Sequence, residues 1–174
     1  MKRTLFLSML AVSLLIHAEA QQGTDLERTS EKIARYVAMR MPGWEEKRGN
    51  LIEGSSDVVI QLWTFPNRIV KVSLMQRESV ADARARLSRF AQDEPEAREL
   101  HGFGDEAYSW GAEDANIVFR RGKYTVYVAT IADVDHDVDA GTLSPAQKHE
   151  RRKSEMKRLS KELAKQTSDA IDQP

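Results

Sequence analysis

The sequence contains no cysteine. Disulfide bonds, cysteine nucleophiles and cysteine-ligated metal centres are therefore excluded, and the fold must be stabilised by packing and polar contacts alone. The chain also lacks the cysteine to which a lipid anchor is attached after export, so we expect the mature protein to be free of a lipid.

Long hydrophobic runs are scarce, and the longest one stands near the start of the chain. Residues 4–16 read "TLFLSMLAVSLLI", after Lys2 and Arg3 and before the small residues of "AEA" at 18–20. This layout is typical of a secretory signal peptide, and the run is shorter than the about 20 apolar residues of a membrane span. The sequence predicts a signal peptide over 1–20, one domain over 21–174, and a periplasmic or secreted protein.

An excess of charge of one sign is also missing. Without Lys2, Arg3 and Glu19, the 26 basic and 27 acidic residues of the chain fall to 24 and 26, a net charge of −2. A general nucleic-acid binder needs a strong positive excess, so nucleic acid is not an expected partner.

Three segments have apolar residues at helical spacing, each on one face: 24–41, 78–92 and 144–171. In the last of them, Ser144, Pro145 and Gln147 stand at the N-cap, first and third positions of a helix start. Ser79 is the expected N-cap of the middle one. The sequence therefore predicts three amphipathic helices.

Between the helices lie segments rich in β-branched and aromatic residues. They cover 57–65, 68–76, 106–111, 115–121 and 124–132, with 51–53 as a further candidate strand. Pro66-Asn67 and Gly122-Lys123 predict tight hairpin turns. The fold class that follows is α+β, in two layers: a largely antiparallel sheet with the helices packed on one face.

Residues 133–139 read "DVDHDVD" and are the strongest candidate for a metal site. Alternating carboxylates in a tight loop can converge on calcium, and Asp133, Asp135, Asp137 and Asp139 match positions 1, 3, 5 and 7 of an EF-hand loop. The match fails at the glycine and glutamate positions, which Val138 and Ser144 occupy. The alternative is an acidic, solvated loop ahead of a basic helix, and the sequence leaves both interpretations open.

A second candidate surface is a row of lysines on the last helix. Lys157, Lys161 and Lys165 lie opposite its apolar stripe, at successive four-residue spacings. Such a row can contact an acidic partner, an anionic envelope polymer or lipid headgroups. A solvated outer face with neighbouring glutamates is the plainer interpretation.

The segment "GFGDEAYSWGAEDANIVFRRGKYTVYV" at 102–128 carries a recognisable pattern: "GxGDEAY", a short loop, and "RRG" between alternating hydrophobic residues. It resembles a segment of exported bacterial proteins and lipoproteins of unknown function, and the extracytoplasmic sensor-like domains of mycobacterial kinases are similar here. Physically, Gly102, Gly104 and Gly122 permit special backbone angles, and Asp105 can bind nearby amides. We interpret the pattern as a folding signature.

The chain has no "GxSxG" nucleophile elbow, and we assign no catalytic residue. The leading hypothesis is therefore an exported, non-enzymatic binding or interaction domain at the cell envelope, whose partner is an envelope protein, a polymer or a small ligand. The alternatives are a small extracytoplasmic enzyme such as a hydrolase, and a structural module stabilised by calcium.

Overall fold

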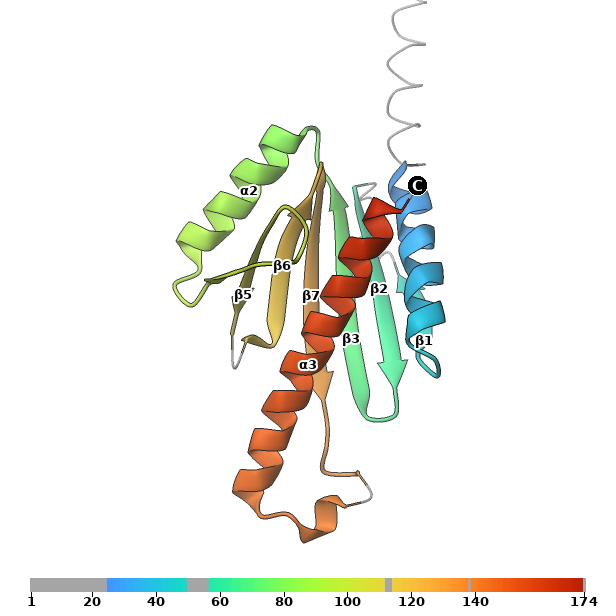
Figure 1. Ribbon diagram of the computed structural model, residues 1–174, viewed down its shortest axis with the longest axis vertical. Coiled ribbons are helices and arrows are strands. Elements are labelled where there is room, and N and C mark those ends of the chain that lie inside the picture. The colour runs from blue at the N-terminus through green and yellow to red at the C-terminus, as the bar shows by residue number, and fades with distance from the viewer. Residues whose placement is uncertain (1–24, 50–56, 112–113, 138, 174) are drawn as a thin grey trace, which may run out of the picture.

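The computed structural model describes residues 25–49, 57–111, 114–137 and 139–173. Within them it contains a seven-stranded antiparallel sheet and three α-helices, which confirms the predicted α+β class (Figure 1). The strands are β1 (Glu45–Gly49), β2 (Val58–Phe65), β3 (Arg68–Gln76), β4 (Arg98–Leu100), β5 (Glu106–Trp110), β6 (Asn116–Arg121) and β7 (Tyr124–Ala132).

The strand order is β1-β2-β3-β7-β6-β5-β4, so two meanders meet where β3 pairs with β7. Each meander contains a two-residue hairpin. Asn67 has a φ of 61° after Pro66, which suits a type II turn, whereas Gly122 has a φ of 56° ahead of Lys123, which suits a type II′ turn. Both turns lie where the sequence predicts them.

The helices are residues 25–40, α2 (Val80–Asp93) and α3 (Pro145–Asp172). The predicted starts of α2 and α3 are confirmed by their caps, and the predicted start of the first helix at residue 24 lies outside the described residues. The Ser79 hydroxyl accepts a hydrogen bond from the Asp82 amide at 3.0 Å. Ser144 and Gln147 form a reciprocal capping box, with Pro145 in the first turn. These local contacts satisfy amides that have no partner within the helix.

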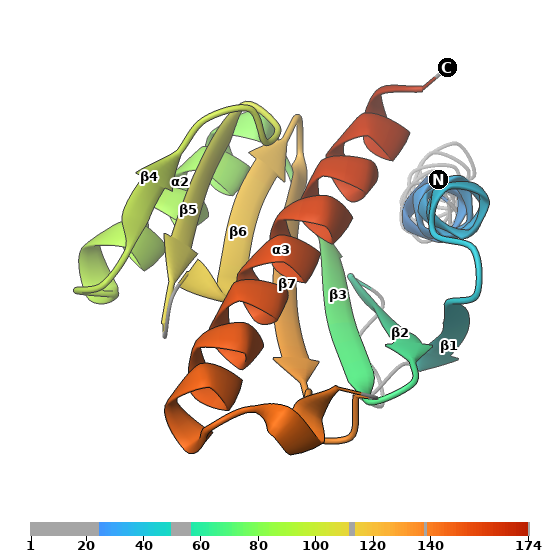
Figure 2. The same ribbon diagram turned by 60° about the horizontal axis from the view of Figure 1, so that its bottom comes forward.

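Residues 25–40 and α3 cover one face of the sheet, as Figure 2 shows for α3. Their apolar stripes meet alternate side chains of the central strands in one core cluster that includes Ile33, Trp63, Phe119, Val128 and Leu163. Each of these five side chains is fully buried. Burial of a large apolar side chain stabilises the fold by roughly 1.5–3 kcal/mol, so this face supplies most of the packing energy.

Helix α2 lies on the opposite face of the sheet, behind β5 and β6 in Figure 2, which corrects the predicted single helical layer. Strand β7 shows the difference directly. Thr130 binds Ser160 of α3 at 2.6 Å, whereas Tyr127, an odd-numbered neighbour, contacts the Phe90 ring of α2 at 5.8 Å. Side chains of a strand alternate between faces, so α2 and α3 sandwich β7. An apolar stripe shows that a helix is packed, but not on which face.

Two edge strands were not predicted. The β1 sequence "EEKRG" has no apolar alternation, and β4 has three residues, so pairing with β2 and β5 rather than local pattern makes them strands. The predicted signal peptide and candidate strand 51–53 lie outside the described residues. No helix in the described ranges is long and apolar enough to cross a membrane.

Candidate functional site

The aspartates of "DVDHDVD" form a loop beneath the N-terminal half of α3, where most of them bind arginines. Asp135 pairs with Arg152 at 2.9 Å and Asp139 with Arg151 at 2.8 Å. Asp133, the exception, accepts hydrogen bonds from the Asp135 amide at 3.0 Å and from His136 at 3.1 Å. The loop is therefore tied to the helix that follows it.

Asp137 is the buried member of the loop, with 14% of its side chain exposed. Arg68, the first residue after the β2–β3 turn, donates to both of its carboxylate oxygens at 3.2 and 3.0 Å. Arg151 approaches the same carboxylate at 3.3 Å. This planar, two-bond pairing is the arrangement that arginine and a carboxylate favour.

The pairs continue along α3 as a chain of alternating charge. Arg68 also donates to Glu155 at 2.7 Å. Arg158 donates to Glu155 at 2.9 and 3.1 Å and to Glu162 at 2.7 Å. In order, the chain runs Asp139, Arg151, Asp137, Arg68, Glu155, Arg158, Glu162. Its central members are largely buried, and its ends face water.

The pKa values of the central pair reflect these contacts. Hydrogen bonds from Arg158 and then from Arg68 outweigh the opposing effect of burial and lower the pKa of Glu155. Hydrogen bonds to Asp137 and then to Glu155 raise the pKa of Arg68. Both groups are therefore held in their charged forms at neutral pH.

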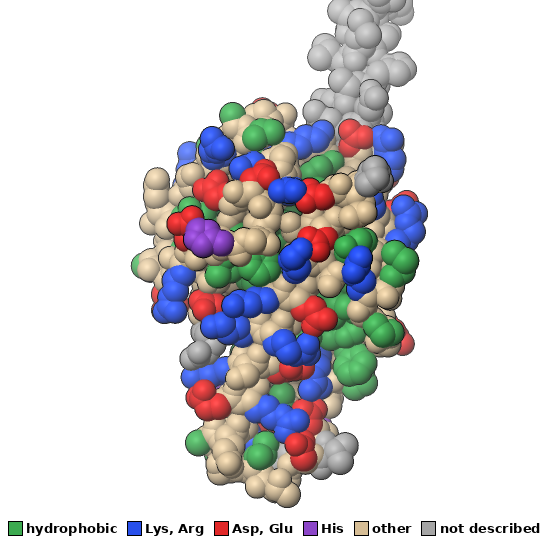
Figure 3. All heavy atoms as spheres, in the orientation of Figure 1, with side chains coloured by type: hydrophobic (Ala, Val, Ile, Leu, Met, Phe, Trp, Pro, Cys, Tyr) green, Lys and Arg blue, Asp and Glu red, His purple; other side chains and the backbone are tan. Residues whose placement is uncertain are grey.

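An open pocket of about 520 Å³ lies beside this chain of charges. Its lining comes from the β2–β3 turn, the aspartate loop and one side of α3: Phe65, Pro66, Asn67, Arg68, His136, Asp137, Asp139, Arg151, Glu155 and Arg158. The Phe65 ring, 40% exposed, stacks on Trp44 with 5.4 Å between centroids. Figure 3 shows hydrophobic side chains gathered beside the charged ones at this end of the molecule.

The pocket brings together His136, Asp137 and Asp139 of the predicted metal loop. No group of three or more His, Asp or Glu side chains in the described part of the chain is arranged to hold a metal ion. The carboxylates of Asp135, Asp137 and Asp139 face guanidinium groups instead. Calcium would have to compete with these guanidinium groups for the carboxylates, so the geometry does not favour the calcium interpretation of the loop.

The predicted lysine row lies along the outer side of α3, and two of its members are paired. Lys157 donates to Asp114 at 3.2 Å, and Lys165 binds Asp169 one turn further along the helix. Lys161 is exposed between them. These acidic neighbours offset much of the positive charge of the row, which keeps its partner-binding role a prediction.

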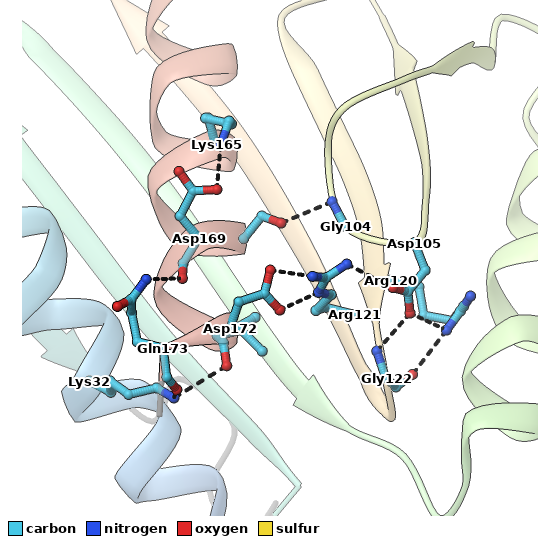
Figure 4. Close-up of polar contacts among 12 residues, drawn as sticks. Lys32, Gly104, Asp105, Arg120, Arg121, Gly122, Lys165, Asp169, Asp172 and Gln173 are labelled. Atoms are coloured by element: carbon cyan, nitrogen blue, oxygen red, sulfur yellow. Dashed lines mark hydrogen bonds and ion pairs between the residues drawn. The ribbon is translucent and has the colours of Figure 1, made fainter.

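The "GxGDEAY…RRG" segment forms a second network, at the C-terminal end of α3 (Figure 4). Asp105 accepts hydrogen bonds from Arg120 at 2.7 Å, Arg121 at 2.9 Å and the Gly122 amide at 2.9 Å. Arg121 also binds Asp172 of α3. The predicted bonding of Asp105 to a backbone amide is confirmed, and that amide belongs to the neighbouring β6–β7 turn.

Two further contacts fasten this end of the helix. The Gly104 amide donates to Ser168 of α3 at 2.9 Å, and Lys32 donates to the Gln173 carbonyl at 2.6 Å. Gly104 has a φ of 59°, and a Cβ there would lie 2.3 Å from the Arg120 carbonyl oxygen. The glycine is thus required both for its backbone angle and for close approach.

Burial alone would raise the pKa of Asp105, but the Gly122 amide and the guanidinium groups of Arg120 and Arg121 outweigh it and lower that pKa. The segment joins the β6–β7 turn to α3, which supports its interpretation as a folding signature.

Sequence reasoning missed the pocket because its residues come from three separate segments. Arg68 and Phe65 flank a predicted turn and show no motif. Arg151 and Arg158 are seven residues apart on a predicted helix, which places them on the same side of it. That spacing was the one sequence feature that pointed to a shared surface.

Comparison of the chain with family models, with curated proteins and with solved structures finds no match.

Proposed function

We propose that this protein is an exported, non-enzymatic binding domain, and that its binding site is the pocket between the β2–β3 turn, the aspartate loop and α3. One observation carries the proposal: the pocket is lined both by the exposed ring of Phe65 and by the side chain of Arg158, 56% of which is in contact with solvent. Aromatic and arginine side chains contribute most of the affinity in protein interfaces.

The construction of the pocket supports a role in binding. Phe65 is supported from behind by Trp44, so the ring is presented by a stacked pair rather than by a single mobile side chain. Arg68 is locked by Asp137 and Glu155, which fixes the polar wall. A preorganised surface loses less conformational entropy when it binds.

The cellular location in this proposal follows from the sequence. The predicted signal peptide over 1–20 and the resemblance of 102–128 to exported bacterial proteins both indicate a partner at the cell envelope. Fractionation of cells that express the full chain tests the location: the mature protein is expected outside the cytoplasm, and a cytoplasmic, uncleaved chain would contradict it.

Photo-cross-linking in cells tests the pocket. A photoreactive aromatic amino acid replaces Phe65, or, as a matched control, Ile131, which is 67% exposed elsewhere on the surface. We expect a discrete adduct from position 65 and none from position 131. Equal labelling from both positions, or none from position 65, would contradict the proposed site.

A further inference from the structure

The three arginines of the pocket differ in how freely each can turn toward a ligand. Arg68 is fixed, because its Nε and both Nη atoms donate to acceptors and both of its acidic partners are largely buried. If it turned away, buried carboxylates would lose a partner in a region of low dielectric constant. Arg68 is therefore a positioning residue and not a contact for a ligand.

Arg151 and Arg158 are held differently. If Arg158 turns outward, Glu155 keeps Arg68 and Glu162, 36% exposed, is solvated. If Arg151 turns outward, Asp137 keeps its two bonds to Arg68, and Asp139 is 65% exposed to water. Exposed ion pairs contribute little to stability, so either guanidinium can exchange its carboxylate for that of a ligand at small cost.

The spacing of these two arginines indicates the shape of the ligand. Seven residues separate them on α3, which places them on the same side of the helix and about 10 Å apart along its axis. In an extended polyproline-type peptide, side chains three residues apart lie on one side with about 9 Å between them. Two carboxylates at that spacing match the two arginines, and the residues between them face the pocket.

We propose that the pocket binds an acidic peptide segment of a partner protein, with Arg151 and Arg158 each recognising one carboxylate and Phe65 contacting an apolar residue between them. This inference rests on the proposed function and names its ligand class. The apolar rim of Phe65, Pro66 and Trp44 favours a peptide over a phosphate or sugar polymer, which has no side chain to bury against it.

NMR titration with a synthetic peptide tests the inference. The probe is acetyl-Gly-Glu-Pro-Leu-Glu-Gly-amide, and its control has glutamine in place of both glutamates. The indole signal of Trp44 reports on the pocket, whereas Trp63 is buried in the core and Trp110 contacts α2. We expect the acidic probe to shift the Trp44 signal alone, and the glutamine control to bind at least about tenfold more weakly, because hydrogen bonds to charged groups are strong.

Arginine variants separate recognition from general charge. The pair R151Q/R158Q is expected to weaken binding of the probe by about tenfold or more. The pair R84Q/R89Q removes the same charge from exposed positions of α2 and is expected to leave the affinity unchanged. Equal losses from both pairs would overturn the proposal, because a nonspecific field would then explain binding.

Two further variants exclude a merely structural effect of the arginine changes. D139N and E162Q each remove the exposed competitor of one arginine, so each is expected to tighten binding of the probe severalfold. If both variants weaken binding, the carboxylates of Asp139 and Glu162 hold the arginines in place for the ligand. The proposal that the arginines exchange these carboxylates for those of the ligand would then be wrong.

Inorganic polyphosphate serves as the alternative ligand. Binding of polyphosphate as tight as that of the probe and unaffected by F65A would overturn the peptide assignment in favour of a polyanion surface. The cross-link from position 65 is independent of this result. If the adduct from position 65 persists in R151Q/R158Q, the binding site stands and the acidic ligand is rejected. If no adduct forms from position 65 when all other pocket residues are unchanged, the proposed function itself is rejected.

Discussion

Both ends of α3 are attached to the rest of the fold by an arginine that bridges two acidic residues, but the consequences differ. At one end Arg68, beside the β2–β3 turn, joins Asp137 to Glu155 of the helix. At the other, Arg121, beside the β6–β7 turn, joins Asp105 to Asp172. In each case a hairpin arginine bridges a loop aspartate and an acidic residue of α3.

The difference lies in what surrounds the bridge. The C-terminal end is closed, because Gly104 brings the loop against both the helix and the Arg120 carbonyl. The N-terminal end extends beyond the strands in Figure 1, and its pairs line an open pocket. One end of the helix therefore anchors the fold, while the other offers charged groups that are paired but still accessible to a ligand.

The largest expected effect is at the closed end, from G104A. The new Cβ meets a backbone oxygen at 2.3 Å and requires a positive φ, so we expect a loss of about 4 kcal/mol in the free energy of unfolding. G102A is the matched control: its φ is also positive, at 86°, but nothing lies within 4 Å, and about 1 kcal/mol is expected. Equal losses in urea melts would mean that close packing at Gly104 is unimportant.

The second prediction compares two variants, D105A and D137A, each of which lacks the loop aspartate at one end of α3. D105A leaves Arg120, 4% exposed, with Glu106 at 3.8 Å as its remaining ion pair among the described residues, and we expect a loss of about 3 kcal/mol. D137A leaves Arg68 with Glu155, so about 2 kcal/mol is expected. The reverse order in chemical denaturation would show that the open end is the stronger anchor.

The two ends should also differ in acid. The pKa values of Glu155 and Asp105 are lowered in the folded state, from the ordinary values of 4.5 and 3.8. Each carboxylate therefore contributes stability that is fully present above its unfolded-state pKa and is lost as the pH falls below it. We expect the melting temperature to be steady from pH 7 to 5 and then to fall.

Variants assign that fall to each end. E155Q is expected to remove the part of the pH dependence that begins near pH 4.5, and D105N the part that begins nearer pH 3.8. Melting curves of both variants between pH 3 and 6 provide the measurement. A pH dependence that E155Q leaves intact would mean that the arginine contacts of Glu155 are not formed in solution.

Calcium is expected to have the smallest effect. The carboxylates of Asp135, Asp137 and Asp139 are bound to guanidinium groups. Arg68, Arg151 and Arg152 would have to be displaced before one ion could bind all three. We expect no heat in a calorimetric titration and no change in melting temperature. Micromolar binding that is lost in D135A would support the metal site. It would also mean that the arginine pairs at the N-terminal end of α3 rearrange when calcium binds.

The sequence by itself determined the elements that local physics controls. The caps at Ser79 and Ser144, the turns at Pro66-Asn67 and Gly122-Lys123, and the apolar stripes depend on neighbours within a few residues. Alternation along β3 determined which of its faces is buried, and the tight turns determined the antiparallel pairing of the strands that they join.

Tertiary structure alone decided the rest. The face on which α2 packs and the pairing of β1 depend on contacts between segments that no local pattern encodes. The pairing of "DVDHDVD" with arginines does so too, because Arg68 is 69 residues away from Asp137 along the chain. Charged side chains are paired by their positions in space. A row of aspartates therefore looks the same in sequence whether it binds a metal ion or, as here, the guanidinium groups of a neighbouring strand and helix.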